Sequence, residues 1–129
     1  MVKTAAGTAA GTVIVRVGTA GTTADTARLT FTWGAGTAAV DTGIYGVIVH
    51  FRSVGAGTSA VLVGYVQLDH HLAATGLTAT GAAGTGVLLV TSGGFDSTVA
   101  NLVIGASYNG GASFSGTNTV VEAELLNSV

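Results

Sequence analysis

The sequence contains no cysteine, and only 8% of its 129 residues are charged. Without cysteine there are no disulfides and no thiolate metal site, so packing, backbone pairing or oligomerisation must stabilise the fold. An ordinary soluble domain has about 25% charged residues. A free monomer with so few charges would expose a large neutral surface and tend to associate. We therefore expect a surface covered by sister subunits, by small neutral side chains, or by both.

Clustered cations and long apolar runs are also missing. The only lysine is Lys3, and the three arginines are scattered along the chain, whereas a nucleic-acid surface needs grouped cations. Apolar runs such as residues 87–90 are far shorter than the roughly 20 residues of a membrane span. The first residues lack the apolar core of a signal peptide. We expect no nucleic-acid or membrane partner, and synthesis in the host cytoplasm.

Short runs rich in Val, Ile, Leu, Thr and aromatic residues alternate with turns that use many of the 21 glycines. No window shows sustained helical periodicity with caps, so the pattern is that of an all-β sandwich or barrel. Apolar residues at every second position support these strands. In residues 27–33, for example, Leu29, Phe31 and Trp33 share one face. The predicted strands cover residues 12–17, 27–33, 44–53, 60–71, 86–91, 98–108 and 119–126. We predict a two-sheet antiparallel sandwich of seven to eight strands.

Residues 1–24 differ from the rest because they are rich in Gly, Ala and Thr, with few large side chains outside Val13 to Val17. Two interpretations stay open at this point. The segment is either an extended arm that orders on contact with a neighbour, or a first strand with flexible flanks. Residues 25–129 are predicted to form the sandwich domain.

Two predicted strands are apolar on both faces, which places one face in the core and the other in a subunit interface. The predicted interface residues are Tyr45, Val47, Val49, Phe51, Val61, Val63 and Tyr65. The first partner that we expect is therefore another copy of the same chain.

Polar groups that could carry chemistry are few. Asp69 and His71 share a side of their predicted strand, but one histidine and one carboxylate are too few for a metal site within a chain. Copies of His50 or His71 could instead gather on a three-fold axis and hold a metal or an anion; the alternative is a polar strand end. No nucleophile motif, paired-carboxylate site or phosphate loop is present. We predict no enzyme and no cofactor.

Trp33 stands at a strand end beside a glycine turn, where partial exposure is expected. An exposed indole could stack on a sugar, although packing in a core or an interface is the commoner role.

The segment TWGAGTAAVDTGIYGVIVHFRSVGAGTSAVLVGYVQLDHHLAATG, at residues 32–76, resembles a family of small tailed-phage virion proteins with a jelly-roll, TNF-like fold. The segment FDSTVANLVIGASYNGGASFSGTNTVVEAELL resembles the end of the same family. The resemblance covers about residues 27–126. It implies a jelly roll, a homotrimer mounted on a capsid or tail, and no active site.

The resemblance and the charge deficit together predict a non-enzymatic structural virion protein. Its most concrete form is a capsid decoration protein that oligomerises, contacts the major capsid protein or another virion protein, and reinforces the phage head. The alternative is a module of a tail fibre or spike that recognises a host surface glycan, with Trp33 as its contact.

Overall fold

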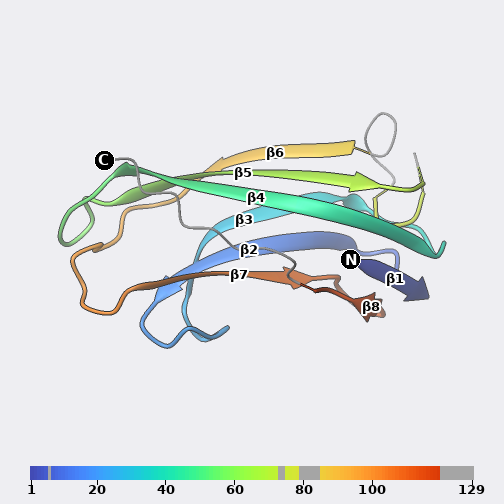
Figure 1. Ribbon diagram of the computed structural model, residues 1–129, viewed down its shortest axis with the longest axis horizontal. Helices are drawn as coiled ribbons and strands as arrows, with labels where there is room; N and C mark the ends of the chain where they lie inside the picture. Colours follow the sequence, from blue (N-terminus) through green and yellow to red (C-terminus); the bar gives the residue numbers. More distant parts are fainter. Residues whose placement is uncertain (6, 73–74, 79–84, 120–129) are drawn as a thin grey trace.

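The computed structural model describes residues 1–5, 7–72, 75–78 and 85–119. These residues form eight strands in two antiparallel sheets, and they contain no helix. Figure 1 shows β4, β5 and β6 as one layer above β3, β2 and β7, with β1 and β8 at the right-hand end. The predicted all-β, two-sheet antiparallel sandwich is confirmed.

The five-stranded sheet has the order β6-β5-β4-β1-β8, and the three-stranded sheet has the order β3-β2-β7. The strands are β1 (Val2–Ala5), β2 (Ala10–Gly18), β3 (Thr26–Ala35), β4 (Asp41–Ser53), β5 (Val61–His70), β6 (Thr85–Thr91), β7 (Val103–Asn109) and β8 (Ser115–Thr117).

The chain is wound in a nested way. The first strand pairs with the last, β1 with β8, and the second pairs with the seventh, β2 with β7. Pairing of this kind joins strands that lie far apart in the sequence within each sheet of the sandwich. Strands β4, β5 and β6 instead form a simple meander, in which each strand pairs with the next along the chain.

The core lies between the sheets and follows the period-two alternation of the sequence. Val13, Val15 and Val17 of β2 are buried, and their neighbours in the strand are less so. Most of the remaining core consists of the inward residues of β3 and β5, and residues outside these strands complete it: Leu29, Phe31, Trp33, Leu62, Val66, Leu68, Ala60, Leu77 and Phe95. Leu29, Phe31 and Trp33 share one face of β3, as predicted, and the structure places that face in the core.

The first 24 residues contain two strands of the sandwich. Strand β1 lies between β4 and β8, and β2 is the central strand of its sheet. The sequence had left open an arm or a first strand with flexible flanks in this segment. Val13, Val15 and Val17 form part of the core, because their side of the central strand β2 faces the other sheet.

One predicted strand begins later than expected. Residues 98–108 were predicted to be extended, but β7 begins only at Val103. Asn101 has a φ of 59°, in the left-handed region, which interrupts an extended backbone. The last predicted strand, at 119–126, lies beyond residue 119 outside the described residues.

Candidate functional site

The two outer faces of the sandwich differ in chemistry. On the three-stranded sheet the outward positions are mostly polar or glycine, among them Thr12, Arg16, Thr30, Thr32 and Ser107, with Ile14 and Val103 as the aliphatic exceptions. On β4, β5 and β6 the outward positions are mostly apolar. We call this second surface the apolar face; it consists of Ile44, Gly46, Ile48, His50, Val63, Tyr65, Gln67, Asp69, Val87, Leu89 and Thr91.

Large aliphatic side chains on the apolar face lie open to solvent. Ile44 is 72% exposed and Leu89 is 70% exposed, and Ile48 and Val87 are also more than half exposed. The strand register sets Ile48, Tyr65 and Leu89 side by side across three strands. Grouped exposed aliphatic residues indicate an interaction surface, whereas single ones are normal on a monomer.

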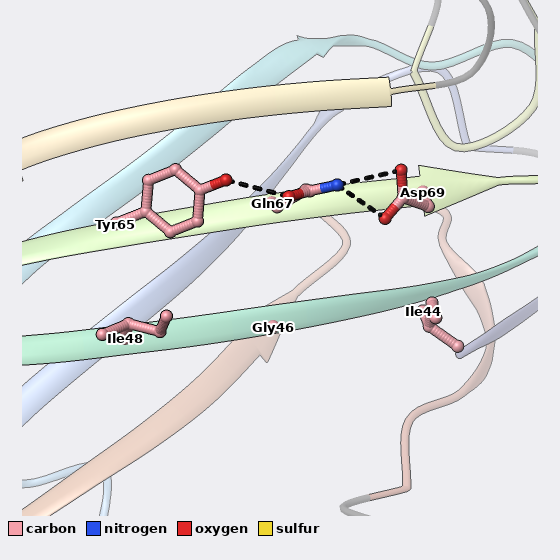
Figure 2. A pocket seen from close by; sticks show the side chains of 6 residues that line it. All are labelled: Ile44, Gly46, Ile48, Tyr65, Gln67 and Asp69. Atoms are coloured by element: carbon pink, nitrogen blue, oxygen red, sulfur yellow. Dashed lines mark hydrogen bonds between the residues drawn. The ribbon is translucent and has the colours of Figure 1, made fainter.

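A hollow of about 250 Å³ lies in the apolar face beside Gly46. Gly46 has no side chain, and a Cβ built there would meet nothing within 4 Å. Ile44 and Ile48 flank it along β4 (Figure 2). The hollow is thus a shallow, mainly apolar depression bounded by two isoleucines.

A row of polar side chains borders the hollow on β5. The Tyr65 hydroxyl donates to Gln67 Oε1 at 2.8 Å, and Gln67 Nε2 donates to both Asp69 carboxylate oxygens at 3.0 and 3.3 Å. Figure 2 shows this row running along the strand. Each side chain holds the next, so the rim of the hollow has a fixed shape.

The ionisable groups of the apolar face stand at its two ends. Asp69 is paired with Ile44 at one end. His50 is paired with Val63 at the other end, three outward positions further along β4. Arg52 lies just beyond this end of the face; it is exposed and sits where the register shifts between Phe51 and Ser53. Six residues of strand span about 20 Å, so an acidic end and a basic end are separated by an apolar centre.

The predicted interface residues divide between the two sides of the sheet. Tyr45, Val47 and Val49 point inward and pack against the core. Phe51, near the end of β4, packs against Phe95 with 6.1 Å between ring centroids and stays partly exposed. The three residues predicted on β5 (Val61, Val63 and Tyr65) alternate with its buried residues and point outward.

The predicted axial residues are not brought together within one chain. His50 and Asp69 lie at opposite ends of the apolar face, and His71 is exposed just after β5 ends. In the described part of the chain, no three His, Cys, Asp or Glu side chains gather where they could hold a metal ion.

Trp33 lies in the core, contrary to the expectation of partial exposure. It is 6% exposed, and its ring packs edge-on against Tyr45 with 6.3 Å between centroids. Its position next to a glycine suggested a turn, but β3 continues to Ala35. The tryptophan is therefore covered by the facing sheet.

A buried polar cluster that the sequence did not predict joins Lys3, Asp41 and His70 where β1 meets β4. Lys3 is 1% exposed, and its ammonium donates to the carbonyl oxygens of Thr37 and Gly76, the latter at 3.1 Å. Burial lowers the pKa of Lys3, and the charge of Asp41 offsets part of that effect. Gly76 has a φ of +84°. It lies so close to the Asp41 carboxylate that a side chain at position 76 would collide with that carboxylate.

Asp41 is the centre of this cluster. Burial by itself raises the pKa of Asp41, but hydrogen bonds from Leu77 N, His70, Thr42 N and Leu72 N outweigh burial and hold that pKa below its ordinary value. These hydrogen bonds hold the surrounding chain segments in place around the Asp41 carboxylate. It is enclosed, so we interpret it as a structural element and not as a binding site.

Comparison with known proteins gives no counterpart: no protein-family model matches the chain, and no curated protein or solved structure matches it. Among the described residues there is no helix long and apolar enough to cross a membrane.

Proposed function

We propose that the protein is a non-enzymatic structural subunit that assembles through its apolar face, and that it serves as a decoration protein on a tailed-phage capsid. The observation that carries the assembly is the contrast between the two outer faces. An antiparallel sheet that packs on the core with one side usually presents polar residues on the other. Here that outward side carries exposed Ile44, Ile48, Val87 and Leu89.

The setting in a virion rests on the resemblance of residues 27–126 to small phage virion proteins. The chain has ten charged residues, four basic and six acidic. As a decoration protein it would therefore bind its neighbours and the capsid shell with few charges. Outermost strands such as β6 and β8 offer backbone groups for pairing with a capsid protein. Assembly through apolar side chains and attachment through strand edges would use separate parts of the sandwich.

The glycan-binding alternative loses the residue on which it relied, because the Trp33 ring packs inside the core.

Localisation and copy number test this function. An antibody raised against the purified chain is used to label particles made by cells that carry its gene together with a complete phage genome. We expect label over the heads, at tens to hundreds of copies per particle by quantitative mass spectrometry. Recovery of the chain only as free protein, away from particles, would overturn the proposal. A few copies at the tail tip would also contradict it.

A further inference from the structure

We infer that the apolar face binds the same face of a second copy of this chain, across a two-fold axis that reverses the strand direction. The inference rests on the proposed function, because it names the partner of the surface proposed for assembly. The axis lies within the interface and runs perpendicular to the strands. Strand β4 of one copy then lies over β4 of the other, with opposite direction, and an isologous contact of this kind closes at two subunits.

The shape of the apolar face complements itself in this arrangement. Gly46 leaves a hollow, and Ile48, the next outward residue of β4, stands beside it and is more than half exposed. When the axis passes midway between the levels of these two residues, Ile48 of each copy stands over Gly46 of the other. The isoleucine side chain enters the hollow, and the contact occurs twice because of the symmetry.

The charges select the direction in which the two faces meet. Reversal brings the end with Asp69 towards the end with His50 and Arg52 of the second copy, and the same contact repeats on the other side of the axis. In the alternative arrangement each end of the face would meet the same end of the second copy. The two acidic ends would then lie together, and so would the two basic ends. Opposite charges that meet across an interface favour the first arrangement and oppose the second.

The area of the face indicates a reversible dimer. Three strands about 4.8 Å apart, taken over about 25 Å of their length, make a patch of roughly 350 Å². Stable complexes bury about 800 Å² per partner. We therefore expect a weak, reversible dimer in solution. On a particle, the high local concentration of subunits would keep the pair together.

The first test measures self-association of the purified full chain by sedimentation equilibrium from about 1 µM to about 1 mM, a range centred on transient affinities. Ile48→Asp places two charges in the contact and should raise the dimer dissociation constant more than about 100-fold. Val103→Asp is the matched control, because Val103 is an exposed aliphatic residue on β7 of the other sheet; its dissociation constant should stay within about twofold of wild type. Circular dichroism verifies that both variants are folded.

The second test determines the direction of pairing. At low salt, Asp69→Lys and Arg52→Glu should each raise the dissociation constant several-fold, since each reverses the charge at one of the two ends that meet, and the change occurs twice because of the symmetry. The double variant Asp69→Lys/Arg52→Glu should return it to near the wild-type value. If instead the equal ends met, the single variants would change little, and that result would overturn the inferred direction.

The outcomes separate the pairing from the proposed function. A wild-type trimer that Ile48→Asp dissociates would overturn the two-fold pairing and leave assembly through the apolar face intact. A dimer that Ile48→Asp does not affect would overturn the pairing through this face. A folded monomer at every concentration would overturn the pairing, and if it also failed to sediment with particles, the proposed function would fall as well.

Discussion

Asp41 Oδ2 lies 2.7 Å from His70 Nδ1, and solvent reaches neither side chain. Three backbone amides, those of Thr42, Leu72 and Leu77, donate to the same carboxylate at 2.8 to 3.3 Å. One side chain therefore joins β4, the end of β5 and the segment that follows β5. This convergence makes Asp41 the residue whose change should affect the fold most sharply.

Asp41→Asn should lower the free energy of unfolding by about 3 kcal/mol, because an amide replaces one acceptor oxygen with a donor that faces other donors. Urea unfolding followed by circular dichroism measures the loss. Asp96→Asn is the control, since Asp96 lies in a loop and bonds mainly to nearby Thr98. An equal loss in both variants would contradict the role given to the buried carboxylate.

The contribution of Asp41 should disappear in acid. The pKa of Asp41 in the folded protein lies below the ordinary value of 3.8, so the unfolded chain binds the proton first as the pH falls. Its stabilisation is complete above about pH 4 and is lost as the pH falls through the folded pKa.

The matching measurement is the difference in urea midpoint between wild type and Asp41→Asn, taken from pH 7 down to pH 2. That difference should narrow below about pH 4. Asp96, whose pKa is also lowered, is present in both proteins, so its effect cancels. A difference that stays constant over the whole range would contradict the assignment.

Two glycines on paired strands should respond in opposite ways to the same change. A Cβ at Gly64 of β5 would lie 2.7 Å from Phe31 Cζ in the facing sheet, so Gly64→Ala should destabilise the fold by about 1–3 kcal/mol through overpacking. Gly46→Ala, which points outward into open space, should leave stability unchanged or raise it by about 0.5 kcal/mol. Thermal melting of the two variants checks the pair, and similar losses in both would refute the assigned faces.

Ser92 connects the end of β6 to β5 and should be sensitive to loss of its hydroxyl. Its Oγ accepts from Leu62 N at 2.9 Å and donates to Gly93 O at 2.8 Å. Ser92→Ala leaves a buried amide without its acceptor, which should lower the free energy of unfolding by about 1–3 kcal/mol. Ser107→Ala, on the outward side of β7, provides the comparison in the same urea experiment and should change little.

Alternation in the sequence predicted the longer strands and their pairs of faces, but it predicted neither β1 nor β8, and it did not show which face of β4 is the core. Tyr45, Val47 and Val49 occupy one face and Ile44 and Ile48 the other, and both sets are apolar. The choice is made by β2 and β3, whose single apolar faces must be covered. A periodic pattern describes one strand and contains no information about that distant partner.

The buried cluster was beyond sequence reasoning for a different reason. Lys3, Asp41 and His70 come from three separate segments, and only the register of β1 on β4 and the approach of β5 bring them together. Period-two alternation does put His70 on the side opposite Asp69, which is the one local signal that it points inward. The sequence offers no corresponding signal for Lys3, whose residue type is almost never buried.

The pairing of β1 with β8, described above as part of the nested winding, has a consequence for the order of folding. Val2 pairs with Thr117, so nearly the whole chain separates the two partners. Contacts of such high sequence separation require the ends of a long loop to meet, and they slow folding into the millisecond-to-second range. During synthesis the first strand has left the ribosome long before its second neighbour exists. On the ribosome, its pairing with β8 can therefore form only late in synthesis, after Thr117 has emerged.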